Sequence, residues 1–135
     1  MGFPSPTLAP YLRQNTIRLS TWPVLRVPPS GVRRARLLLM SSGRTRDMTG
    51  SGPDAGLLRT IVEMMIPRGV ECINPRLPLR EDGFSDTDEA LISLRAEMAA
   101  RALFPDPHCR TAVLAFSLGT LSAIELAVRS EMARV

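Results

Sequence analysis

Residues 111–119 read Thr-Ala-Val-Leu-Ala-Phe-Ser-Leu-Gly, and this stretch decides the fold. Residues 112–116 form an uninterrupted apolar run, which together with Thr111 is typical of a strand that is covered on both faces in a parallel sheet. Ser117-Leu118-Gly119 then turns the chain sharply. From Thr120 to about Met132, apolar side chains recur at helical spacing. The stretch therefore predicts a buried strand over residues 111–116, a tight turn and a helix in direct succession.

The same alternation of strand and helix occurs upstream. Residues 35–40 and 70–73 are two further apolar runs, and each is followed by a polar loop. Helical spacing predicts a helix over residues 54–66, with Asp54 as its candidate N-cap. A second helix, over residues 86–103, opens with a capping-box pattern. This order of elements predicts an α/β fold, with a parallel sheet and helices on its faces.

The first part of the chain has a different character. Residues 1–14 contain Pro4, Pro6 and Pro10, and predict a flexible arm. Short strand patterns follow at residues 15–21 and 24–27, which we expect to make the sheet mixed at its N-terminal edge. The chain thus divides into an arm, residues 1–14, and one domain, residues 15–135.

Composition restricts the class of protein. The 135 residues are 44% hydrophobic but only 4% aromatic, so the core must be aliphatic. A mean hydropathy of +0.05 is too apolar for a disordered chain. No apolar run approaches the ~18–20 residues that span a bilayer, and we expect a cytoplasmic protein without a membrane span. Two cysteines cannot build a disulfide scaffold.

Charge is distributed unevenly along the chain. All 17 cationic side chains are arginines. Residues 1–46 carry eight of them and no acid, whereas residues 47–135 carry nine and 13 acids, so +8 and −4 sum to +4. A basic segment suggests a transit peptide or nucleic-acid binding. Because prolines oppose an amphipathic helix there and only Arg33, Arg34 and Arg36 cluster, we do not expect a nucleic acid as a partner.

The segment Ala115-Phe116-Ser117-Leu118-Gly119 places small residues two positions before and two positions after a serine. Small residues let the chain turn tightly, which exposes the serine hydroxyl at a helix N-terminus that favours developing negative charge. In its predicted place between a strand and a helix, the segment resembles the nucleophile elbow Gly-x-Ser-x-Gly of the α/β-hydrolase superfamily, with Ala115 at the first glycine.

The resemblance extends over roughly residues 15–133. Residues 28–31, the run 35–40 and Ser42-Gly43 look like the approach to the oxyanion loop of α/β-hydrolases. Members of that superfamily commonly have His-Gly where this chain has Ser42-Gly43. The similarity covers the first half of such a hydrolase, through the elbow, and implies a truncated three-layer sandwich.

The resemblance also implies roles for single residues. Ser117 would be the nucleophile, and backbone N–H groups of Leu118 and of Gly43 or Arg44 would form the oxyanion hole. The implied reaction is hydrolysis of a small-molecule ester, thioester or amide. We expect no cofactor and no metal ion, because capping and solvation explain the acidic residues between 81 and 89.

The single histidine limits catalysis by this chain. The superfamily supplies its triad acid and histidine after strands that follow the elbow, whereas His108 precedes the strand of residues 111–116. That strand puts His108 roughly 20 Å from Ser117, at ~3.3 Å per residue, and a general base must lie within ~3 Å of the hydroxyl. We therefore interpret His108 as a loop residue. We expect the isolated chain to be inactive unless a missing segment or a partner chain supplies Asp and His.

A non-catalytic role is the alternative hypothesis. Without the neighbouring strand that the superfamily has, residues 111–116 would form an exposed apolar edge, which favours association. The chain would then be a degenerate hydrolase-like domain that self-associates or binds a partner chain at its open sheet edge.

Two smaller expectations concern side chains near the predicted sheet. In the strand order of the superfamily, Cys72 and Cys109 lie two strand spacings apart, ~9–10 Å, so we expect free thiols. Arg44 and Arg46, in the loop after residues 35–40, would either bind an anionic substrate or stay solvated.

Overall fold

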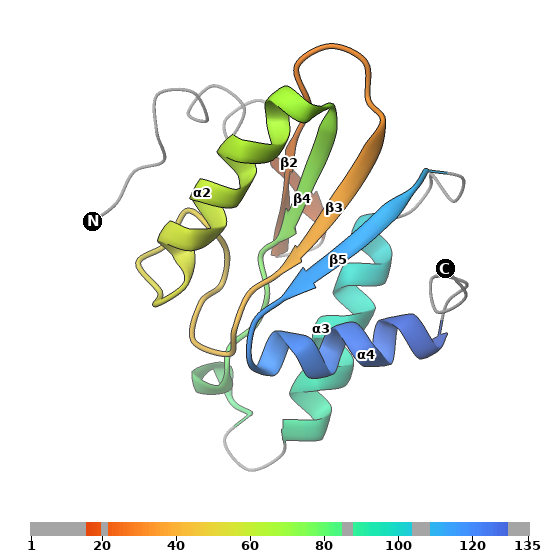
Figure 1. Ribbon diagram of the computed structural model, residues 1–135. Coiled ribbons are helices and arrows are strands. Elements are labelled where there is room, and N and C mark those ends of the chain that lie inside the picture. Colours follow the sequence, from red (N-terminus) through yellow and green to blue (C-terminus); the bar gives the residue numbers. More distant parts are fainter. Residues whose placement is uncertain (1–15, 20–21, 85–87, 104–108, 130–135) are drawn as a thin grey trace.

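The computed structural model describes residues 16–19, 22–84, 88–103 and 109–129. Five strands form one sheet (Figure 1), and in chain order they are β1 (Thr16–Leu19), β2 (Trp22–Val27), β3 (Ala35–Met40), β4 (Val70–Pro75) and β5 (Thr111–Ala115). Across the sheet the order is β1-β2-β4-β3-β5. β3 is parallel to β4 and β5, whereas β2 is antiparallel to β1 and β4. The structure thus confirms an α/β fold with a sheet that is mixed at its N-terminal edge.

Helices cover both faces of this sheet (Figure 1). The helical elements are α2 (Ala55–Met65), η1 (Ile66–Arg68), η2 (Arg80–Asp82), α3 (Asp88–Leu103) and α4 (Leu118–Arg129). α2 packs on one face of the sheet, and α3 and α4 pack on the other. The short helix η1 follows α2 directly, and Gly69 then ends the helical segment. Gly69 adopts the left-handed conformation, with φ of 79°, which is common for a glycine just after a helix.

The sheet divides the aliphatic core into two clusters. The cluster on the side of α3 and α4 contains the buried residues Val24, Leu38, Met40, Ile73, Leu77, Ala96, Ala99, Ala102, Leu103 and Leu126. The cluster on the side of α2 contains Leu25, Val27, Leu39, Met48, Leu58, Val62, Ile66 and Cys72. Successive residues of β3 enter opposite clusters because side chains alternate along a strand. β3 is therefore covered on both faces, as its apolar sequence predicts.

β5 is less buried than its sequence predicts. Among the described strands it is an edge strand with only β3 beside it, and its residues alternate between half-buried and exposed. Leu114 is 36% exposed. The prediction of a strand covered on both faces is therefore wrong for β5, whereas the expected exposed apolar edge is present.

On α3 and α4, some apolar residues that helical spacing assigns to the core are exposed instead. On α3, Leu94 is exposed and the neighbouring Arg95 is fully buried. On α4, Leu121 and Ile124 are exposed, and the helix begins at Leu118, two residues before its predicted start. The helix starts earlier because Gly119 N–H already donates to the carbonyl of Phe116 in the turn.

Some expectations concern residues outside the described ranges. These are the arm of residues 1–14, the first residues of the predicted capping box, and His108. Within the described ranges, no helix is both long and apolar enough to cross a bilayer.

The two cysteines provide a test of the packing. Both thiols are free; Cys72 is fully buried and Cys109 is partly exposed. Burial raises the pKa of the Cys72 thiol to about 12, so this thiol is neither accessible nor ionised at neutral pH.

We expect dithionitrobenzoate at pH 8 to titrate one thiol in the native chain and two in guanidinium. Cys109→Ser should abolish the native reaction; a remaining fast thiol would contradict the burial of Cys72.

Candidate active site

Ser117 occupies a strained turn between β5 and α4. Its φ is 51°, and it is the only non-glycine residue with positive φ in the described parts of the chain. This left-handed conformation costs an L-residue roughly 1–2 kcal/mol, so the surrounding contacts must impose it. Thr120 N–H donates to the Ser117 carbonyl at 2.8 Å and closes the first turn of α4. The Ser117 side chain is exposed.

Gly119 fits this turn tightly against the end of β3. A Cβ on Gly119 would lie 2.5 Å from the Ser41 carbonyl oxygen and 2.7 Å from the Met40 carbonyl oxygen. Both atoms belong to the backbone and cannot rotate away. Glycine is therefore the residue that lets the serine turn approach β3 this closely.

The loop after β3 reaches the same turn. A Cβ on Gly43 would lie 2.7 Å from Leu118 Cδ2 and 3.3 Å from Leu118 Cβ, so the two residues are in contact. Within the described residues, neither the Gly43 N–H nor the Leu118 N–H donates a hydrogen bond. The Arg44 N–H, in contrast, faces the Ser42 hydroxyl at 3.4 Å. The turn that presents Ser117 thus lies beside two backbone donors without partners.

Asp54 braces this loop and does not act as the predicted helix cap. It occupies the N-cap position of α2 but makes no side-chain capping bond. Its carboxylate accepts hydrogen bonds from the Ser42 N–H at 3.1 Å, from the Ser42 hydroxyl at 2.7 Å and from the Thr45 hydroxyl. Burial opposes ionisation of Asp54, but the hydrogen bonds from Ser42 and Thr45 outweigh it and lower the pKa of the carboxyl group.

A cleft of about 1410 Å³ opens at the carboxyl ends of β3, β4 and β5. Its lining includes Ser117, Gly43 and Leu118, together with charged side chains from the loops after β3 and β4. These charged residues are Arg44, Arg46, Asp47, Asp54, Arg76, Arg80 and Glu81. The carboxyl ends of parallel strands are the usual location of ligand sites in α/β sheets.

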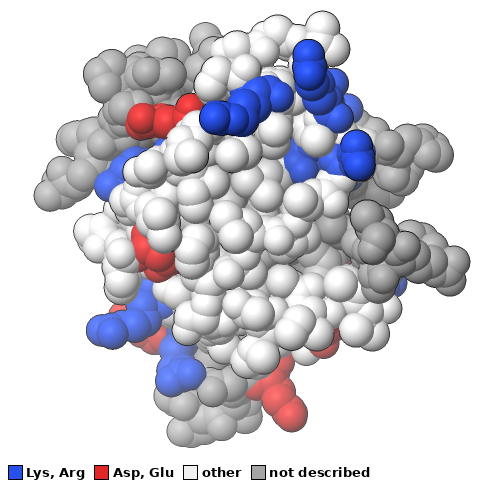
Figure 2. Space-filling view, viewed as in Figure 1, with Lys and Arg blue, Asp and Glu red and all other residues white. Residues whose placement is uncertain are grey.

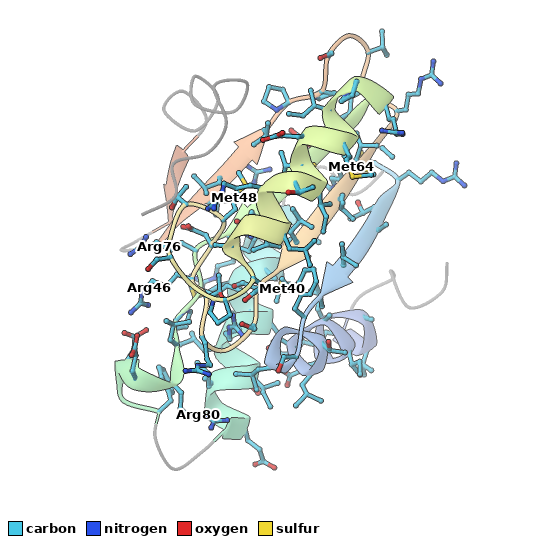
Figure 3. All side chains as sticks on the ribbon, turned by 60° about the vertical axis from the view of Figure 1, so that its left-hand side comes forward. Met40, Arg46, Met48, Met64, Arg76 and Arg80 are labelled. Carbon is cyan, nitrogen blue, oxygen red and sulfur yellow. The ribbon has the colours of Figure 1, made fainter. Side chains whose placement is uncertain are left out.

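The charges around the cleft are largely paired. Arg46 donates two hydrogen bonds of 2.5 Å to Asp82, which raise the pKa of Arg46 and lower the pKa of Asp82. Arg76 lies 3.7 Å from the buried carboxylate of Asp47. Figure 3 labels Arg46 and Arg76, which approach from the loops after β3 and β4. Arg44 is exposed and forms no ion pair within the described residues. Of the two arginines considered for an anionic substrate, Arg46 is therefore engaged by Asp82, whereas Arg44 has no carboxylate partner among the described residues.

The described part of the chain contains no group of three potential metal ligands. It also contains no histidine, because His108 lies outside it. β5 separates Cys109 from Ser117 along the chain. The arrangement thus combines an exposed hydroxyl with two free backbone donors, and no described imidazole accompanies them.

Comparison with known proteins adds no relative to this description: no protein-family model, curated protein or solved structure matches the chain.

Proposed function

We propose that this chain carries the nucleophile and the oxyanion hole of an α/β-hydrolase-like serine hydrolase. The observation that supports this most directly is the left-handed conformation of Ser117 beside the unengaged N–H groups of Gly43 and Leu118. The chemical class of substrate is a small-molecule ester, thioester or amide, whose carbonyl Ser117 would attack.

In the proposed reaction the Ser117 oxygen forms a bond to the substrate carbonyl carbon, and the carbonyl oxygen becomes an oxyanion. The N–H groups of Gly43 and Leu118 would donate to that oxyanion, and the N-terminus of α4 would add its partial positive charge. The hydroxyl proton needs an acceptor, and an unassisted serine is a weak nucleophile. We infer that sustained turnover requires an Asp and a His from outside the described residues.

The alternative is a non-catalytic domain that binds through its edge. β5 has a free edge, Leu114 is exposed there, and Leu121 and Ile124 of α4 are exposed as well. The surface that carries β5 and α4 is largely uncharged in Figure 2. These features favour association of an apolar kind, with a second copy or a partner chain, and they need no reactive serine.

A fluorophosphonate probe distinguishes the two functions. One oxyanion-hole donor contributes about 10²–10³-fold to attack by the nucleophile, so we expect Ser117 to react about 10³-fold faster than Ser51, an exposed serine that lines the same cleft. Peptide mapping by mass spectrometry identifies the labelled residue. Ser117→Ala should abolish the fast labelling, and Ser51→Ala should leave it unchanged. Hydrolysis of p-nitrophenyl acetate by the isolated chain should stay near the background rate.

The alternative gains support from a different result. If folded protein, verified by circular dichroism, labels Ser117 no faster than Ser51, the hydrolase proposal fails for this chain.

A further inference from the structure

Arg95 is a fully buried arginine that contacts the loop after β3. It lies on α3, with an exposed fraction of 0%. Its Nη2 donates to the Ser41 carbonyl at 2.8 Å, to the Ser42 carbonyl at 2.9 Å and to the Ser41 hydroxyl at 3.1 Å. The two N–H groups of this nitrogen are thus shared among three acceptors and connect α3 to the loop that contains Gly43.

Stability alone does not account for this arginine. Its Nε and Nη1 atoms are buried and have no hydrogen-bond partner among the described residues. Burial lowers the pKa of the Arg95 guanidinium to about 10, which leaves it charged at neutral pH. A buried charge with unsatisfied donors is costly, and an apolar side chain of similar shape often replaces one without loss of stability. The contacts of its Nη2 therefore indicate what this residue contributes.

The peptide groups of the loop show what that contribution is. A trans peptide is planar, so its C=O and N–H point in opposite directions. The peptide between Ser41 and Ser42 is held at both ends, by Arg95 at the carbonyl and by Asp54 at the N–H. The peptide between Ser42 and Gly43 is held at its carbonyl end, by Arg95 at 2.9 Å and by the Thr45 N–H at 3.2 Å. Its N–H belongs to Gly43 and must point away from Arg95.

We propose that Arg95 is a positioning residue that turns the Gly43 N–H into the cleft beside Ser117. The catalytic role of Arg95 rests on the proposed function, in which the Gly43 N–H is one of the two oxyanion donors. Arg95 itself is not among the residues that line the cleft.

Residual dipolar couplings test the positioning directly and independently of catalysis. In ¹⁵N-labelled protein aligned in a dilute gel, the one-bond N–H coupling of Gly43 reports the orientation of that bond relative to the helices. We expect the native coupling to fit an N–H bond that is parallel to the Ser42 carbonyl bond that Arg95 holds. In Arg95→Met the Gly43 coupling should depart from this value, while the couplings of α2 and α4 still fit. Arg95→Lys, which keeps a charged donor, should retain most of the native orientation.

The rate of Ser117 phosphonylation gives the functional readout. Loss of one oxyanion donor costs about 10²-fold, so Arg95→Met should label about 10²-fold more slowly than the native chain, and Arg95→Lys should recover part of the difference. Arg59→Met is the matched control. Arg59 also donates to carbonyls of this loop, those of Met48 and Gly50, but not near Gly43. Arg59→Met should leave the Gly43 coupling at its native value and change the rate of Ser117 phosphonylation less than twofold.

The outcomes separate this inference from the proposed function. An unchanged Gly43 coupling in folded Arg95→Met overturns the positioning role, whatever the labelling shows. Absence of fast labelling in the native chain overturns the hydrolase proposal but leaves the coupling test intact. If Arg95→Met does not fold, Arg95→Gln, which is uncharged and too short to bridge both carbonyls, is expected to give the same altered coupling and slow labelling.

Discussion

Gly119→Ala is expected to lower the free energy of unfolding by about 3 kcal/mol, at the upper end of the cost of overpacking a core. The added methyl group would meet the carbonyl oxygens of Ser41 and Met40 at 2.5 and 2.7 Å. Neither oxygen can move unless α4 separates from β3. We therefore also expect any variant that still folds to lose the fast labelling of Ser117. Urea denaturation followed by circular dichroism measures the change in stability.

Gly56→Ala is the matched control for this prediction. Gly56 is the second residue of α2, as Gly119 is the second residue of α4. A Cβ on Gly56 would have only Arg59 Nη2 near it, at 3.7 Å. Alanine should stabilise the chain there by roughly 0.5–1 kcal/mol through the smaller entropy of its unfolded state. If both alanines changed the stability alike, the close approach of Gly119 to β3 would be refuted.

Asp54→Ala is expected to lower the free energy of unfolding by about 3 kcal/mol at pH 7. The change removes an ionised acceptor of three hydrogen bonds from Ser42 and Thr45, and a hydrogen bond to a charged group contributes a net ~1.5–3 kcal/mol. Because Asp54 is only half-buried, water can solvate the donors that the variant frees, which keeps the total loss below the sum of the three. Glu63→Ala, at an exposed position of α2, should change stability by no more than about 0.5 kcal/mol. Urea denaturation of both variants at equal ionic strength provides the comparison.

The same carboxylate predicts a pH dependence. Because folding lowers the pKa of Asp54 below its ordinary value of 3.8, the folded state favours the ionised form. The stabilisation is therefore complete above that value and is lost as the pH falls through the lower pKa of the folded state. The stability difference between the native chain and Asp54→Ala should be constant from pH 5 to 7 and shrink below pH 3.8. A difference that persists unchanged into stronger acid would mean that ionised Asp54 does not hold the loop.

Local sequence patterns predict most of the architecture. The run at residues 35–40 matches β3 residue for residue, and the helix expected over residues 54–66 differs from α2 by one residue at each end. The Ser117 turn is also predictable, because a strand, small residues and a helix follow one another within 20 residues. Such features depend on neighbours along the chain, so periodicity and turn residues suffice to find them.

The bracing of the loop depends on contacts that no local pattern contains. Arg95 follows Leu94 in the sequence, and apolar spacing assigns Leu94 to the core. The structure instead buries Arg95, because its bonds join residues 53 and 54 positions away, at Ser42 and Ser41. Likewise an Asp before a helix predicts a cap, and only the folded loop directs the Asp54 carboxylate to Ser42. Arg95 lies four positions after Leu91, so both side chains lie on the same face of the helix. This spacing is the one feature of the sequence that indicates the burial of Arg95.

The place of β3 between β4 and β5 determines when the site is assembled. Only the α2–η1 segment and its loops separate β3 from β4 along the chain, but Arg36 of β3 pairs with Thr111, 75 residues further along the chain. Contacts between distant residues carry the larger loop-closure entropy and form late in folding. Gly43 and Leu118 are separated by the same 118 − 43 = 75 residues and meet only when β5 docks. A chain caught with β3 and β4 paired but β5 loose has no site, so reactivity at Ser117 would count only molecules that have completed folding.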